Sequence, residues 1–187
     1  MAELNQQEQK ELLTLARSTI KKYLASASRD YLPFTNPVFN EKRGVFVTLH
    51  RCGELRGCIG YPLPYKPLWQ AVVDNAIAAS SEDPRFPAVT AAELPDLDIE
   101  ISVLTVPQKV ADQAQVQVGR DGIIISKGFQ RGLLLPQVPV EQGWDLEQYI
   151  SYGCRKAGLA PDEWKKSVQI ETFQALVFAE KELVKKP

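Results

Sequence analysis

The sequence predicts an α+β fold in which a largely antiparallel sheet is flanked by helices. Three observations favour this class: runs that alternate apolar and polar residues, pairs of such runs joined by glycine-containing turns, and helical segments without a regular strand–helix–strand rhythm. The chain has 187 residues, of which 44% are hydrophobic, which suffices for one core and is too short for two ordinary independent domains. We therefore expect residues 1–187 to form a single domain.

The first half of the chain predicts a helix, a hairpin and a second helix. Apolar residues recur at spacings of three and four from Glu8 to Leu24, as in an amphipathic helix. Two prolines make residues 31–44 a loop, and the strand-like run 45–60 is expected to turn back on itself at Cys52–Gly53. Residues 68–82 follow a proline and carry their apolar side chains on one helical face, so we expect the second helix there.

The second half predicts a strand, a second hairpin, a helix and a closing strand. Residues 97–106 alternate with the period of a half-buried strand, and 119–138 hold two short apolar runs with glycine-rich turns. A helix is expected from Glu147 to Ala157, with Gly158 at its C-terminal cap. The tail, 167–183, alternates well enough to form one closing strand.

Composition and charge exclude several classes of protein. Lys and Arg together number 22 against 23 Asp and Glu, so no global excess of charge draws the chain to nucleic acid or to an anionic membrane. The N-terminal segment has no long apolar run, so we expect neither a signal peptide nor a membrane span, and a cytoplasmic location. A single histidine and three irregularly spaced cysteines do not match a zinc site or a disulfide framework. We predict no metal and no cofactor.

Four sequence blocks occur together in a characteristic order: GVFVTLHRCGELRGCIG, SSEDPRFPAVTAAELPDLDIEISVL, GRDGIIISKGFQRGLLLPQV and CRKAGLAPDEW. With these blocks the chain resembles the AMMECR-one domain family, whose hallmark is the hexapeptide LRGCIG, over about residues 40–180. The resemblance implies an α+β fold of two unequal lobes that enclose a cleft lined by the hexapeptide. It also implies two directions for function: an enzyme that modifies nucleic acid, or a component that works beside Memo-like and radical SAM proteins.

The register of the first hairpin decides what lies beside Cys58. A turn at Cys52–Gly53 pairs Cys58 with Val47 and places Arg56 on the same face of the strand, because side chains alternate. His50 then points to the opposite face, which argues against a Cys–His nucleophile pair.

The hexapeptide offers one candidate catalytic residue, Cys58, and three candidate substrate contacts. Arg56 provides a cation that could activate the thiol and hold an anion. Gly57 and Gly60 interrupt a strand, which often marks the close approach of a ligand or of another backbone. The alternative for Cys58 is plain packing, since free cysteine is among the most buried residue types.

Three further residues are weaker candidates. Arg85 follows a turn expected at Asp83 and could contact an anionic substrate, or only form a structural ion pair. Glu100 lies on the polar side of its strand, where it could act as a general base or simply be solvated. Gln137 could donate a hydrogen bond to a ligand or close a loop.

Two functions stay open on these grounds. The first is a cytoplasmic enzyme, or enzyme component, with a Cys58/Arg56 cleft site that acts on an anionic substrate such as nucleic acid. The alternative is a non-catalytic module that binds a peptide or a partner protein, with the Memo-like and radical SAM proteins implied by the resemblance. No membrane partner is expected.

Overall fold

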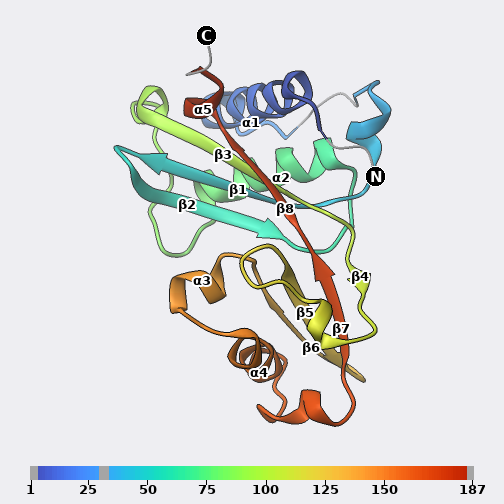
Figure 1. Ribbon diagram of the computed structural model, residues 1–187. Helices are drawn as coiled ribbons and strands as arrows, with labels where there is room; N and C mark the ends of the chain where they lie inside the picture. The colour runs from blue at the N-terminus through green and yellow to red at the C-terminus, as the bar shows by residue number, and fades with distance from the viewer. Residues whose placement is uncertain (1–3, 30–33, 185–187) are drawn as a thin grey trace. The chain divides into compact units, whose positions relative to one another are not determined.

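The computed structural model describes residues 4–29 and 34–184 (Figure 1). Contacts divide the chain into two compact units, Met1–Leu104 with Leu176–Pro187, and Thr105–Ala175. No helix among the described residues is long and apolar enough to cross a membrane. Each unit has its own hydrophobic core.

The first unit is built on a four-stranded sheet with the strand order β2-β1-β3-β8. The strands are β1 (Gly44–Arg51), β2 (Glu54–Tyr61), β3 (Leu97–Leu104) and β8 (Ala175–Ala179). The predicted turn between β1 and β2 is confirmed, since Cys52 and Gly53 both have positive φ, at 54° and 89°. Such a pair of left-handed residues matches the twist of a two-residue hairpin.

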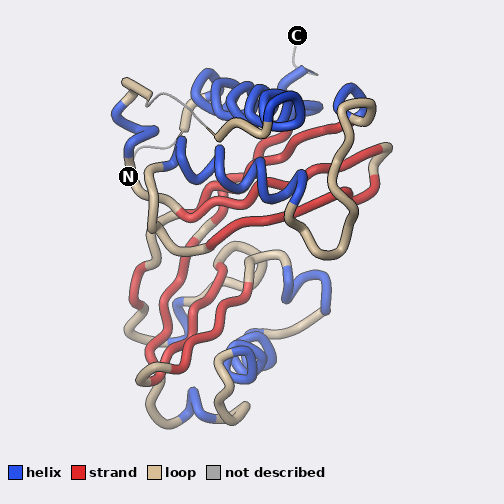
Figure 2. The backbone as a smooth tube through the Cα atoms, turned by 180° about the vertical axis from the view of Figure 1, so that it is seen from behind, coloured by secondary structure: helices blue, strands red, loops and turns tan. Residues whose placement is uncertain are grey.

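Two helices cover one face of this sheet, as Figure 2 shows. They are α1 (Gln6–Ser26) and α2 (Leu68–Ser81), close to the predicted bounds. The side chains alternate in burial from Val45 to His50 in β1 and from Leu97 to Val103 in β3. The buried ones pack in the core with the helices: Val45, Val47, Leu49, Leu97, Ile99, Ile101 and Val103. The half-buried side chains of the same strands therefore point to the other face.

Short elements complete the first unit. The 3-10 helix η1 (Pro37–Asn40) falls in the predicted loop 31–44, of which residues 31–33 lie outside the described part. A second 3-10 helix, η2 (Leu94–Asp96), leads into β3, and the helix α5 (Glu180–Val184) follows β8.

The second unit holds another antiparallel four-stranded sheet, with the order β4-β7-β5-β6. Its strands are β4 (Gln108–Lys109), β5 (Gly122–Lys127), β6 (Gln130–Leu134) and β7 (Gln169–Phe173). Its helices are α3 (Val138–Gln142) and α4 (Leu146–Lys156), with the 3-10 turns η3 (Gln113–Gln115) and η4 (Glu163–Lys165). The predicted second hairpin is thus confirmed as β5 and β6.

The α+β class with antiparallel sheets is confirmed, but the tail differs from the prediction. Instead of one closing strand, residues 167–183 form β7 in one sheet, β8 in the other and the beginning of the helix α5, with Gln174 between the two strands. The amide of Gln174 donates to Thr105 Oγ1, and its carbonyl accepts from the Thr105 amide. Alternation along a sequence gives the period of a strand but not the sheet to which it belongs, so this break could not be read from the pattern.

The register of the first hairpin also differs from the prediction. Thr48, not Val47, faces Cys58, and the pairing shifts by one residue between Leu49 and His50. This irregularity is a β-bulge, in which one strand carries an extra residue; here the residue of β2 without a partner is Arg56. A plain two-residue hairpin has no such insertion, which is why the predicted register was wrong.

The shifted register changes the neighbours of Cys58. Directly opposed residues share a face of the sheet, so Cys58 lies on the face of Thr48 and His50 rather than on that of Val47. The prediction that His50 points away from Cys58 was therefore wrong. We call the polar members of this face the polar face; they are Thr48, His50, Cys58, Asp98, Glu100 and Ser102.

Candidate functional site

Cys58 lies in the edge strand β2, and a loop holds its main chain. The amide of Cys58 donates to Asp83 Oδ2 at 2.8 Å, and its carbonyl accepts from Arg85 Nη2 at 3.2 Å. Since both main-chain groups point to this loop, Cys58 and Thr48 form a non-hydrogen-bonded pair, the kind in which opposed side chains lie closest. The loop thus completes the outer edge of the sheet at Cys58.

Asp83 is the buried centre of this arrangement, at 4% exposure. It accepts two side-chain hydrogen bonds from Arg85, at 3.0 and 2.8 Å, and one from the Arg85 amide at 3.1 Å. The bond to the amide confirms the predicted Asx turn. The Arg85 guanidinium is the main reason that the pKa of Asp83 lies well below its usual range, and the bond from the Cys58 amide contributes to it.

The thiol of Cys58 has two polar neighbours. Thr48 Oγ1 donates a hydrogen bond to Cys58 Sγ at 3.3 Å. The bonds of Arg85 to Asp83 are the main reason that the pKa of Arg85 is raised, and the nearby Cys58 side chain contributes to this shift. Cys58 is half-buried, and the Arg85 side chain is 54% exposed. The thiol therefore lies beside an accessible cation and a hydroxyl donor.

Thr48 also connects Cys58 to β3. It is paired with Cys58 on one side and with Glu100 on the other, so the three side chains form a row across three strands. Burial raises the pKa of Glu100, and the positive charge that His50 can carry partly offsets this effect. A carboxyl group with a raised pKa takes up a proton more readily than an exposed one does.

Arg56 is bound to the same loop as Arg85 but through other partners. Its Nε donates to Glu93 Oε1 at 2.9 Å, and its terminal nitrogens donate to the carbonyls of Pro87 and Ala88 at 2.9 and 3.3 Å. Both side chains of the ion pair are 13% exposed. Arg56 lowers the pKa of Glu93 to about 2, with help from the Thr90 amide. These contacts tie the loop to β2.

The two glycines of the hexapeptide are in tight contact with the protein itself. A Cβ at Gly57 would lie 2.2 Å from the carbonyl oxygen of Ala79 in α2. At Gly60 it would lie 2.3 Å from the carbonyl oxygen of Val45 and 2.5 Å from the ring of Phe46. Packing of a backbone and of an aromatic ring accounts for both positions, which is one of the two roles considered for them.

Gln137 belongs to the second unit, where it precedes α3. It is exposed, and its main-chain carbonyl accepts from Glu141. The side chain makes no capping hydrogen bond to α3. Its role as a substrate contact stays a prediction.

Sequence reasoning did not single out Thr48 and assigned His50 to the wrong face. The apolar alternation of Val45, Val47 and Leu49 already places Thr48 on the opposite face of the strand. Its partner on the neighbouring strand, however, depends on the register. Among the described residues, no group of three His, Cys, Asp or Glu side chains is placed to hold a metal ion. The cofactor prediction itself stays a prediction.

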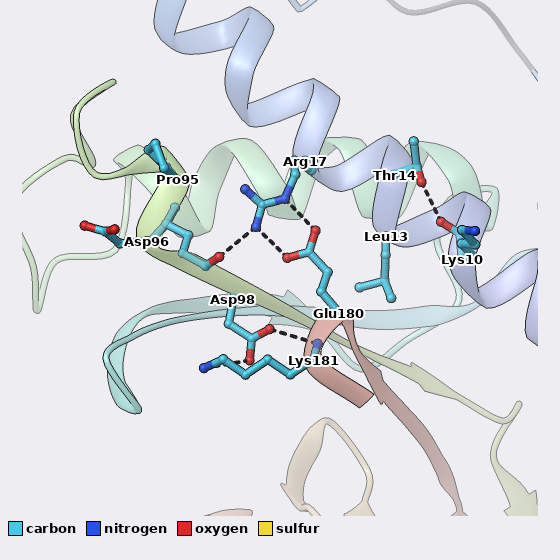
Figure 3. Close-up of a pocket in the computed structure, with 10 residues that line it drawn as sticks. Lys10, Leu13, Thr14, Arg17, Pro95, Asp96, Asp98, Glu180 and Lys181 are labelled. Carbon is cyan, nitrogen blue, oxygen red and sulfur yellow. Dashed lines mark hydrogen bonds and ion pairs between the residues drawn. The ribbon is translucent and has the colours of Figure 1, made fainter. Parts of the chain in front are cut away.

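A surface pocket of about 710 Å³ lies elsewhere in the first unit, between α1, the start of β3 and α5 (Figure 3). Its polar groups are largely bound to one another: Arg17 pairs with Glu180 and donates to the carbonyls of Leu94 and Leu97. Asp98 accepts from the amide of Lys181. The residues that line this pocket include none of the candidates for a functional site.

Comparisons with known proteins give one consistent picture. The AMMECR1 family model matches residues 13–178. A protein of Methanothermobacter thermautotrophicus is 45% identical over 187 residues, covering 96% of this chain and 97% of that protein. Protein MJ0810 of Methanocaldococcus jannaschii is 48% identical over 176 residues, covering 89% and 87%. The crystal structure of the uncharacterized protein PH0010 from Pyrococcus horikoshii superimposes with a TM-score of 0.76 at 43% identity, covering 91% and 90%.

Proposed function

This chain belongs to the AMMECR1 family, and we propose that it is an enzyme, or a component of one, whose reacting group is the Cys58 thiol and whose substrate carries an anionic group. The observation that carries the proposal is the position of the thiol. It is half-buried, receives a hydrogen bond from Thr48, and lies beside the half-exposed guanidinium of Arg85. The thiolate is the reactive form of cysteine, and a neighbouring cation favours it.

Arg85 has two tasks in this proposal. Its bonds to Asp83 fix its direction, while its 54% exposure leaves part of the guanidinium open to a ligand. A planar guanidinium fits carboxylates and phosphates, so the substrate class is a carboxylate or a phosphate compound, nucleic acid included. The anionic group would bind Arg85 and present a neighbouring carbon to Cys58.

In the chemical step, the Cys58 sulfur forms a bond to an electrophilic carbon of the substrate, and the bond from that carbon to its leaving group breaks. The thiol proton leaves toward the polar face, where Glu100 provides negative charge in the same row of side chains. Arg56 supports the loop rather than the substrate, because Glu93 and two carbonyls already occupy its donors. Gln137 stays a proposed substrate contact.

The test is the alkylation of each cysteine in the native protein, followed peptide by peptide by mass spectrometry. Iodoacetate and iodoacetamide react alike with a thiol but differ in charge. We expect Cys58 to prefer iodoacetate more strongly than the exposed Cys52 does, and the buried Cys154 to stay protected, which reports an intact fold. Arg85→Gln should lower the iodoacetate preference of Cys58 about fivefold, because it removes the positive charge that attracts the anionic reagent.

Arg29→Gln is the matched control. The Arg29 side chain is 54% exposed, like that of Arg85, but its contacts are with Glu82 and the ring of Tyr23. It should leave the preference unchanged. If Cys58 is alkylated only after denaturation, or if Arg85→Gln keeps the wild-type preference, the proposal is wrong.

Protection by added anions then separates the substrate classes. Acetate, inorganic phosphate and a short oligonucleotide are each added before iodoacetamide. Protection by the oligonucleotide that fades steeply as salt rises would favour nucleic acid, because phosphate contacts depend on released counterions. A Cys58 that is inert under all conditions would instead favour the alternative of a non-catalytic module for protein partners such as Memo-like or radical SAM proteins.

A further inference from the structure

His50 is the single histidine of the chain, and β1 places it on the polar face. Along this strand Val45, Val47 and Leu49 are fully buried against the helices, whereas Thr48 and His50 are half-buried. Since β1 pairs with β3 without any shift from end to end, its alternation is unbroken at His50. His50 and Thr48 therefore project from the same side of the sheet.

Cys58 and His50 are diagonal neighbours across β1 and β2. Cys58 stands directly opposite Thr48, and His50 is two residues further along the same face. Diagonal positions in an antiparallel pair are about 7–8 Å apart at the Cα level, within the combined reach of an imidazole and a thiol. The bulge lies beside these residues, and bulges commonly redirect side chains next to active sites.

The charged groups next to His50 lie on β3, and charged residues of α5 interact with them in turn. β3 supplies Asp98, its direct partner, and Glu100, which interacts with it electrostatically. α5 supplies Lys181, which binds Asp98, and Glu182, whose charge acts on Glu100. With Asp98 held by Lys181, Glu100 is the carboxylate left to accompany a protonated imidazole.

The other cations near His50 and Cys58 are bound to carboxylates of their own. Arg51, the next residue on β1, pairs with Glu93 at 3.2 Å and with Asp96 at 3.4 Å. Arg85 is held by Asp83 on the far side of Cys58 from β1. The Cys58 thiol thus has a cation on one side and a neutral or protonated histidine, backed by a carboxylate, on the other.

We infer that His50 takes the proton of the Cys58 thiol and that Glu100 stabilises the imidazolium so formed. The inference rests on the proposed function. The S–H bond breaks and an N–H bond forms on the imidazole, while the thiolate keeps its bond from Thr48 and its contact with Arg85. When the sulfur has bonded to the substrate carbon, the leaving group departs with its electron pair and receives the proton back from His50. The arrangement is one nucleophile, one base and one carboxylate.

The experiment is the pH dependence of Cys58 alkylation by iodoacetamide between pH 5 and 9.5. In the wild-type protein the rate should rise in two steps, because neutral His50 assists the reaction at lower pH and hydroxide removes the thiol proton at higher pH. His50→Gln should leave one step and slow the reaction at pH 7 about tenfold, a modest loss for a general base. At pH 9.5 the two proteins should react alike, because hydroxide then removes the proton.

Arg51→Gln is the control variant, since Arg51 neighbours His50 but is bound to Glu93 and Asp96. It should keep both steps, and Cys154 should stay protected in every variant. If Cys58 reacts quickly in the wild-type protein and His50→Gln has the same profile, the role of His50 is refuted while the proposed function stands. If Cys58 is inert in the wild-type protein, the proposed function and the role of His50 are both refuted.

A second measurement needs no change at His50. Because the chain has one histidine, its imidazole gives a single set of ring proton signals in an NMR titration. Replacing the thiol in Cys58→Ser should move the midpoint of that titration, as should Glu100→Gln. A midpoint that is the same in all three proteins would overturn the inference even if the His50 variant did not fold.

Discussion

The main-chain amide of Cys58 donates a hydrogen bond of 2.8 Å to the buried carboxylate of Asp83, rather than to a neighbouring strand. The same carboxylate orients the guanidinium of Arg85 toward Cys58. One acidic side chain therefore fixes both the position of the thiol and the cation beside it.

Asp83→Ala should destabilise the protein by about 2–3 kcal/mol, because it leaves the Cys58 amide and the Arg85 guanidinium without their partner. The free energy of unfolding in urea measures this loss. Asp96→Ala is the control, since that side chain is 54% exposed and makes one long ion pair at 3.4 Å. It should cost less than about 0.5 kcal/mol. Equal losses in the two variants would contradict the central role given to Asp83.

The ion pair between Arg56 and Glu93 should make the free energy of unfolding decrease at acidic pH. Arg56 lowers the pKa of Glu93 from 4.5 to about 2. Because the folded-state pKa lies below the unfolded value, the contribution is complete above about pH 4.5 and is lost as the pH falls toward about 2. Glu93→Gln should cost about 1–2 kcal/mol at pH 7.

The difference between the wild-type protein and Glu93→Gln should shrink steadily in urea unfolding at pH 7, 4 and 3. Glu82→Gln, which loses an exposed pair with Arg29, serves as the control and should differ little from the wild type at any pH. A Glu93→Gln loss that stays constant down to pH 3 would show that charge plays no part in the contact.

Gly57→Ala should destabilise the first unit by more than about 2 kcal/mol, since the new methyl group would meet the Ala79 carbonyl and push α2 from the sheet. Gly53→Ala isolates the other cost of losing a glycine: its φ is +89°, but nothing lies within 4 Å of the added Cβ. It should cost about 1 kcal/mol. The melting temperatures of the two variants rank these costs, and the opposite order would refute the packing role of Gly57.

Glu100→Gln should stabilise the protein at pH 7. Burial raises the pKa of Glu100, so folding favours the protonated form, and the charged form opposes folding once the pH exceeds the unfolded-state value. We expect the free energy of unfolding in urea at pH 7 to be higher for Glu100→Gln than for the wild-type protein. The gain should vanish below about pH 4, because Glu100 is then protonated in the wild-type protein and the residue at position 100 is neutral in both proteins. A loss of stability at pH 7 would contradict this account.

Much of the fold could be predicted from the sequence, because apolar periodicity reports burial directly. The helices from Glu8 and from residue 68, the two hairpins and the strand beginning at residue 97 all follow from it. Periodicity does not show with which other strand a strand pairs. That is why the tail was expected as one strand, although β7 and β8 belong to different sheets.

In the candidate site, the neighbours of Cys58 could not be predicted because they depend on a register shift of one residue. Cys58 and Arg85 were singled out from the sequence, and the structure places them in contact. The neighbour expected for the thiol was Arg56, but the extra residue in β2 exchanged it for Thr48 and His50. The extra residue, Arg56, binds Glu93, which is 37 positions away in the sequence, and such a long-range contact has no local signal.

The loop around Asp83 and Arg85 also bears on how the molecule meets its neighbours in solution. The outer strand of an open sheet presents unpaired amides and carbonyls, and these can recruit a strand from another chain and begin aggregation. At Cys58 both groups are already taken, the amide by a carboxylate and the carbonyl by a guanidinium. The two side chains that support the thiol thus also prevent the sheet from growing, at this point, by the addition of a foreign strand.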